Sequence, residues 1–72
     1  MTIREALRLA AARLEQAGVP DADVDAAYLL ASVFKEDTLA MRINGHRELA
    51  APQRAAFDAL CDRRAAREPL QY

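Results

Sequence analysis

The segment from Ala26 to Phe34 is apolar except for Ser32, although the residues on either side of it are rich in charge. A helix that is apolar nearly all round lies in the interior and is covered on several sides. In a chain of 72 residues, the remaining segments must then pack around this one. The few β-branched residues never alternate with polar ones, so no strand is predicted. The sequence therefore predicts an all-α fold, a compact bundle of four to five short helices with the second helix at its centre.

The first helix is predicted over residues 2–17. Thr2 and Glu5 have the spacing of a capping box, in which each side chain bonds a free amide at the start of a helix. A single apolar stripe follows at spacings of three and four residues; it consists of Ile3, Leu7, Ala10, Leu14 and Ala17. Gly18 comes directly after the stripe and suits the left-handed position that ends many helices.

Three aspartates precede the central apolar segment. Asp21 follows a Val-Pro turn and is predicted to cap the central helix with its side chain. Asp23 and Asp25 fall in the first turn, where the helix dipole favours acidic residues. The three also look like a carboxylate cluster, but a calcium-binding loop needs a glycine and a terminal glutamate that this segment lacks. We therefore expect capping and dipole roles for them.

A short third helix is predicted between the central helix and a loop. Asp37 suits its N-cap, and Asn44-Gly45 is a strong stop signal. Its apolar residues are Leu39, Met41 and Ile43. Residues 46–51 are predicted to form the loop that follows, with Leu49 as its apolar anchor.

The fourth helix is predicted to begin with Pro52 at its first position, where a missing amide costs nothing. It is expected to reach about Ala66, before Pro69 breaks it. One face of this helix is formed by Phe57, Leu60, Cys61 and Arg64.

Composition and charge narrow the class of protein. With 10 basic and 11 acidic residues the net charge is −1, whereas a dedicated nucleic-acid binder carries a clear basic excess. No apolar run approaches the length of a membrane span, and the N-terminus shows no secretory pattern. Cys61 is the only cysteine, so no intrachain disulfide can form, which fits a reducing compartment. We expect a cytoplasmic protein without a membrane or nucleic-acid partner.

Few residues are candidates for chemistry. His46 is the only histidine, and one ligand cannot build a metal site. Cys61 falls on an apolar helix face, where a buried structural thiol is expected rather than a nucleophile. Arg63, Arg64 and Arg67 are expected to stabilise the end of the fourth helix through its dipole, although they could also contact a phosphate or an acidic partner.

The sequence contains no glycine-rich phosphate loop and no Ser-His-Asp set. It therefore predicts no catalytic, cofactor-binding or metal-binding residues in this chain.

The last ten residues, Arg63 to Tyr72, read R-R-A-A-R-E-P-L-Q-Y. They resemble the R-R-x-x-G-E-P-L-x-Y run that ends the N-terminal domain of the bacterial protein-(glutamine-N5) methyltransferases that modify peptide chain release factors. Three further segments are similar to that family in the same order; they are Thr2-Ile3-Arg4-Glu5-Ala6-Leu7, Asp25-Ala26 with Leu29-Leu30-Ala31, and Arg47-Glu48-Leu49 with Pro52.

The chain departs from the family pattern at several positions. Arg67 stands where the family usually has glycine, Ala27 where glutamate is common, and Phe34-Lys35 where Leu-Gly is frequent. None of these positions is catalytic, because the N-P-P-Y motif and the S-adenosylmethionine site of the family lie further along the full chain.

The resemblance implies that residues 1–72 are a helical substrate-recognition domain of a methyltransferase whose catalytic domain is absent from this chain. The full enzyme would use S-adenosylmethionine to methylate the glutamine of the G-G-Q motif in release factors. The implied partner is a release factor, and a monomer is expected. By analogy, exposed positions of the first and fourth helices would face the release factor.

Two other functions are compatible with the residues. A free-standing helical module for protein-protein interaction would contact its partner through an exposed apolar patch, to which Leu9, Leu39 and Met41 could contribute. A small helix-turn-helix DNA-binding protein is the third possibility, and the acidic charge balance argues against it.

Overall fold

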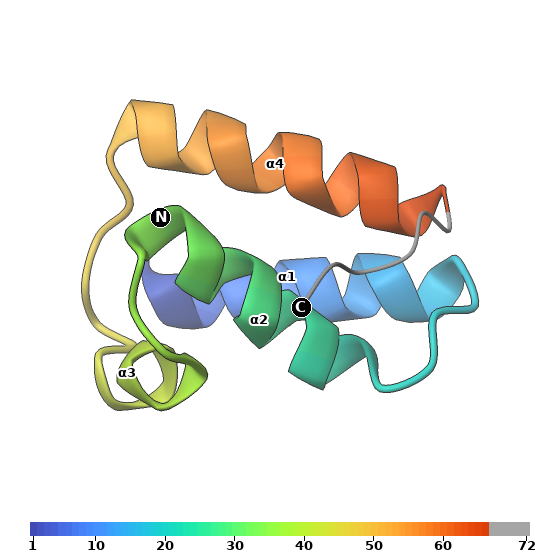
Figure 1. Cartoon of the computed structure of the whole chain (residues 1–72), viewed down its shortest axis with the longest axis horizontal. Helices are drawn as coiled ribbons and strands as arrows, with labels where there is room; N and C mark the ends of the chain where they lie inside the picture. The colour runs from blue at the N-terminus through green and yellow to red at the C-terminus, as the bar shows by residue number, and fades with distance from the viewer. Residues whose placement is uncertain (67–72) are drawn as a thin grey trace.

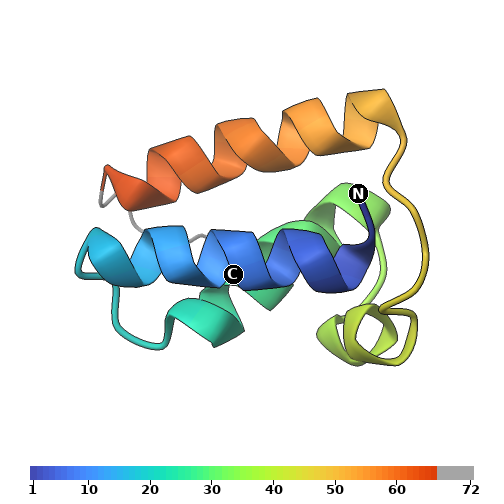
Figure 2. The same cartoon turned by 180° about the vertical axis from the view of Figure 1, so that it is seen from behind.

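The computed structural model describes residues 1–66 and contains four helices in this range. They are α1 (Ile3–Gln16), α2 (Ala22–Phe34), α3 (Thr38–Ile43) and α4 (Ala51–Ala65). Helices α1 and α4 lie side by side, α2 packs against both, and α3 lies at the end where α1 begins and α4 begins (Figure 1). The view from behind shows the same arrangement (Figure 2). The all-α prediction is confirmed.

Helix α2 is the centre of the bundle, as its apolar sequence predicts. It packs against each of the other three helices. Leu30 is fully buried, and the same core cluster contains Ile3 and Leu14 from α1 and Phe57 from α4. The core therefore forms around the segment whose sequence is apolar on nearly every side.

The start of α1 is fixed by its capping box and by a distant loop. The Glu5 amide donates to the Thr2 hydroxyl at 3.2 Å, and the Thr2 amide donates to Glu5 Oε1 at 3.0 Å. The Thr2 hydroxyl also donates to Glu5 Oε1, at 2.9 Å, and the bonds that the Thr2 amide and hydroxyl donate to this carboxyl lower the pKa of Glu5. The next free amides of the helix donate to the loop before α4, Ile3 to the Arg47 carbonyl and Arg4 to the Gly45 carbonyl.

The helix boundaries differ slightly from the predicted ones. Helix α1 ends at Gln16 with Ala17 as its cap, and Gly18 takes the predicted left-handed conformation with φ 84°. Helix α4 begins at Ala51, so Pro52 occupies its second position and not its first. Gln53 accepts from the free Ala50 amide at 2.8 Å, which ties the start of α4 to the preceding loop.

Asp21 is the N-cap residue of α2, as predicted, but it does not cap the helix with its side chain. Its backbone is left-handed with φ 52°, and its side chain makes no capping hydrogen bond. A capping side chain normally comes from an extended residue. Here the turn around Pro20 imposes a different backbone, and only the Asp21 carbonyl bonds the helix, accepting from the Asp25 amide at 3.0 Å.

The short helix α3 has the predicted cap but not the predicted exposed face. Asp37 Oδ1 accepts from the Ala40 amide at 2.8 Å. Met41, which the sequence suggested for an exposed patch, is completely buried, because the inner side of α3 packs on α2. Leu39 and Ile43 are the large apolar residues of α3 that face outward.

Candidate functional site

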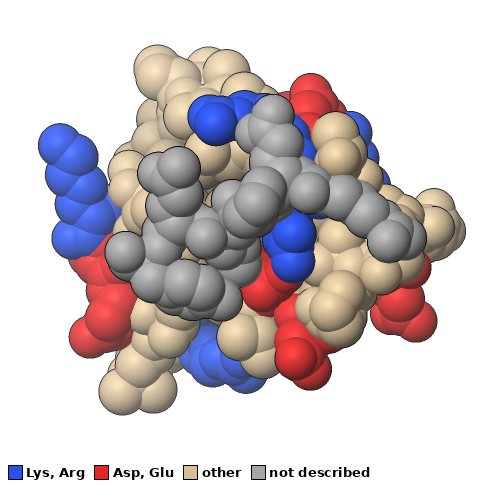
Figure 3. Space-filling view, turned by 45° about the vertical axis from the view of Figure 1, so that its right-hand side comes forward, with Lys and Arg blue, Asp and Glu red and all other residues tan. Residues whose placement is uncertain are grey.

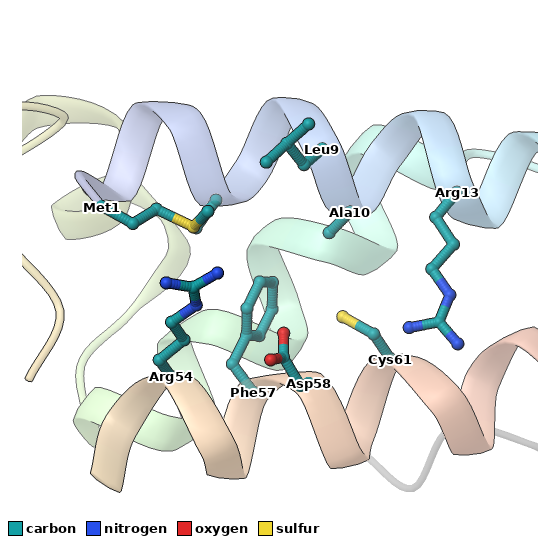
Figure 4. A pocket seen from close by; sticks show the side chains of 9 residues that line it. Met1, Leu9, Ala10, Arg13, Arg54, Phe57, Asp58 and Cys61 are labelled. Atoms are coloured by element: carbon teal, nitrogen blue, oxygen red, sulfur yellow. The ribbon is translucent and has the colours of Figure 1, made fainter. Parts of the chain in front are cut away.

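A groove of about 150 Å³ lies between α1 and α4. Phe57 and Cys61 reach from α4 toward α1 (Figure 4). Its apolar lining is completed by Met1, which precedes α1, and by Ala6, Leu9 and Ala10 of α1. Leu9 is 53% exposed although it is a large apolar residue, so this groove offers apolar surface to the solvent.

Charged side chains also line the groove. Arg54 of α4 and Arg13 of α1 lie toward its two ends, and Asp58 of α4 lies between them beside Phe57 (Figure 4). Arg13 forms an ion pair with Asp62, which joins the two helices at one end of the groove. A partner seated here would meet an apolar floor and charged rims, which is the usual composition of a protein interface.

Cys61 is buried in the wall of the groove, as predicted. Burial raises the pKa of its thiol to about 11. The thiolate is the reactive form of cysteine, so at neutral pH Cys61 is a protonated, covered thiol and not a nucleophile. Its contribution is to the packing of α4 on the core.

Asp25 and Arg64 form an ion pair that the sequence analysis did not predict. Arg64 Nε donates to Asp25 Oδ2 at 3.0 Å, and both side chains are largely covered. The prediction that Asp25 serves only the dipole of α2 was incomplete, because its carboxylate joins the start of α2 to the end of α4. The residues are 39 positions apart, so no short-range pattern could have indicated this pair.

The other candidate residues are not brought together. His46 is exposed in the loop after α3, and Asp21 and Asp23 are exposed at the opposite end of the bundle. Arg63 is exposed in the last turn of α4, and Arg67 lies outside the described residues. Within residues 1–66, no three His, Cys, Asp or Glu side chains lie close enough to hold a metal ion.

The surface charges are mixed in sign. On the face that Figure 3 shows, basic and acidic side chains of the described residues are interspersed with each other. This distribution agrees with the net charge of −1 and does not favour a nucleic-acid interface there. Of the helices in residues 1–66, none combines the length and apolar character needed to cross a membrane.

The family model for the PrmC N-terminal domain matches residues 5–72. The chain belongs to this family. It is also similar to the release factor glutamine methyltransferase of Deinococcus radiodurans, with 42% identity over 73 aligned positions. That alignment covers the whole of this chain but only 26% of the relative, so this PrmC N-terminal domain spans about a quarter of the relative's length. No solved structure matches the chain.

Proposed function

We propose that this PrmC N-terminal domain is the substrate-recognition domain of a release factor glutamine methyltransferase. The observation that carries the proposal is the similarity to such an enzyme along the whole chain, together with a family match over residues 5–72. The complete protein would use S-adenosylmethionine, bound by a catalytic domain further along, to methylate the G-G-Q glutamine of a release factor in the cytoplasm. This chain would act as a monomer that holds the protein substrate.

We place the release factor on the exposed parts of α1 and α4, at the groove between them. The groove exposes apolar surface at Leu9 and is flanked by charged side chains, which suits binding rather than bond-making chemistry. Because Phe57 and Cys61 hold α4 against the core, the two walls of the groove are already in position before a partner arrives. A preformed site loses less conformational entropy when it binds.

Titration of the 72-residue chain with a purified release factor tests this proposal. Leu9→Gln should raise Kd by about tenfold, the effect expected when an apolar anchor at the middle of an interface is lost. Val24→Gln is the matched control, because Val24 is 52% exposed but lies on α2 outside the groove. Circular dichroism melts of both variants would verify that they fold.

Two results would contradict the proposal. If the wild-type chain does not bind the release factor at any accessible concentration, recognition does not reside in this domain. If Leu9→Gln and Val24→Gln weaken binding equally, the domain binds but the groove is not its docking place.

A further inference from the structure

The loop between α3 and α4 runs past the end of the bundle where α1 and α4 begin (Figure 1). Three backbone hydrogen bonds of 2.8 to 3.0 Å tie residues 45–49 of this loop to residues 1–4. One of them runs from the Leu49 amide to the carbonyl of Met1, which lines the groove. Helix α4, the other wall of the groove, begins at Ala51. The same short segment therefore holds the start of one wall and leads into the other.

Arg47 fastens this loop to the end of the central helix. Its Nη1 donates to the two carboxylate oxygens of Glu36 at 3.3 and 3.2 Å, and its guanidinium lies 4.8 Å from the centroid of the Phe34 ring. Phe34 is the last residue of α2, and Glu36 follows shortly after it. A guanidinium can pair with a carboxylate while it stacks on an aromatic ring, so one side chain makes both contacts.

The backbone of Arg47 extends this connection to two further helices. Its carbonyl accepts from the Ile3 amide at 2.8 Å, at the start of α1, and its amide donates to the Asn44 carbonyl at 2.9 Å, at the end of α3. The next residue, Glu48, lies with Oε2 2.9 Å from the Met1 amine. Arg47 thus joins α1, α2 and α3 at a single position of the chain, immediately before α4.

The groove depends on this loop at one end more than along the rest of its length. At its middle, Phe57 packs α4 into the core, and toward the other end the ion pair of Arg13 with Asp62 joins the two helices. At the end lined by Met1 and Arg54, the loop makes the connection between the two walls. A change in the position of the loop would therefore be felt first at that end.

We propose that Arg47 is a positioning residue of the groove. By fastening the loop to α2, its side chain fixes the distance between Met1 on one wall and Arg54 on the other. This assigns a role to the segment Arg47-Glu48-Leu49, which the proposed function leaves without one. The expected effect on release factor binding rests on the proposed function, whereas the effect on the loop does not.

Hydrogen exchange of the 72-residue chain, followed by NMR, measures how firmly the loop is held. In Arg47→Ala, the amides of Ile3 and Leu49 should exchange at least fivefold faster than in the wild type, and the Leu30 amide in the core should accelerate less. Arg47→Lys, which keeps a charge for Glu36, should exchange more slowly than Arg47→Ala.

Arg42→Ala is the matched control. It removes an exposed arginine from the neighbouring helix α3, and the Arg42 side chain makes no hydrogen bond or ion pair within residues 1–66. The exchange rates of the Ile3 and Leu49 amides should remain those of the wild type. Circular dichroism melts verify that each variant folds.

Titration with a release factor tests the consequence for the groove. Arg47→Ala should raise Kd about threefold to fivefold. The double variant Arg47→Ala/Leu9→Gln should raise Kd by less than the product of the two single effects, because both substitutions act on one groove. Arg42→Ala should bind like the wild type.

The outcomes separate this inference from the proposed function. Equal acceleration of the loop and core amides would mean that Arg47 only adds general stability, and the inference would be wrong. It would also be wrong if Arg47→Ala weakened binding at unchanged exchange rates, because Arg47 would then contact the release factor itself. If Leu9→Gln weakens binding and Arg47→Ala does not, the function stands and the positioning role is refuted. If the wild-type chain does not bind, the proposed function fails, and the exchange rates still decide whether Arg47 holds the loop.

Discussion

At the scale of single residues, Lys35 has an unfavourable backbone conformation. It ends α2 in the left-handed conformation with φ 57°, and the Glu36 amide behind it donates to the Ala31 carbonyl at 3.0 Å. This is the arrangement in which helices usually place glycine, because a Cβ atom in a left-handed residue costs roughly 1–2 kcal/mol. The resembling methyltransferases frequently have glycine at this position.

We expect Lys35→Gly to raise the free energy of unfolding by about 1 kcal/mol, since relief of the Cβ strain exceeds the entropy that glycine adds to the unfolded chain. Urea denaturation measures the change. Lys35→Ala keeps the Cβ atom and should show no such gain. Asp21→Gly should gain less, because aspartate tolerates its left-handed conformation better than lysine does. A lower stability of Lys35→Gly would refute this account.

Cys61 should make stability depend on alkaline pH. Its pKa is about 11 in the folded chain, above the ordinary value of 9.0. The folded state therefore keeps the thiol proton over a range in which the unfolded state loses it. Stability should be unaffected below about pH 9, fall as the pH rises toward 11, and level off above that. Between pH 8 and 11 the melting temperature of the wild type should fall more steeply than that of Cys61→Ala, and parallel curves would contradict this account.

At the scale of helices, the elements that were predicted well depend on local signals. The capping box at Thr2 and the apolar stripe behind it suffice to define α1, and the apolar segment of α2 places that helix at the centre. The predictions that failed concern residues whose surroundings depend on contacts between distant segments. The packing of α3 on α2 decides that the side of α3 with Met41 faces inward. The partner of Asp25 comes from the end of α4.

The groove was not predicted from the sequence. The resemblance to the family only suggested that exposed positions of α1 and α4 would face a release factor, and the presence of Leu9 and Phe57 in one groove depends on how the two helices pack. The hydrogen bonds from Ile3 and Arg4 to the loop before α4 were equally invisible in the sequence, because any loop carbonyl can accept them.

The central position of α2 predicts the cost of truncating its core residue. Leu30 is fully buried among side chains from the other helices. Leu30→Ala should lower the free energy of unfolding by about 2–5 kcal/mol, through lost burial and the cavity that remains. The total free energy of unfolding of a domain of this size is only about 5–15 kcal/mol or less. Thermal unfolding followed by circular dichroism is the measurement, and a melt like that of the wild type would show that α2 is not central.

The ion pair between Asp25 and Arg64 should couple α2 to α4. Asp25→Asn and Arg64→Met should each destabilise the chain by about 1–3 kcal/mol, because each leaves a largely covered charge without this partner. The double variant should cost less than the sum of the two, with a coupling of about 0.5–3 kcal/mol. Denaturant titration of the four proteins completes the cycle. Strict additivity would mean that the two side chains do not interact.

At the scale of the whole molecule, the described residues form surfaces that could hold a protein substrate. They include the groove between α1 and α4, whose wall contains a thiol that stays protonated at neutral pH. A domain with these features can change how strongly a protein substrate is held. In the proposed enzyme, binding energy gained away from the reacting glutamine would lower KM for the whole release factor.

Deletion of residues 1–66 from a full-length enzyme of this family tests whether this domain holds the protein substrate while the rest of the enzyme performs the reaction. KM for an intact release factor should rise at least tenfold, whereas kcat/KM for a short peptide with the G-G-Q motif should change little, because a peptide does not reach the deleted surfaces. Binding of S-adenosylmethionine to the truncated protein verifies that its catalytic domain is folded. Equal losses on both substrates, with S-adenosylmethionine binding intact, would mean that this domain supports the chemical step itself rather than holding the protein substrate.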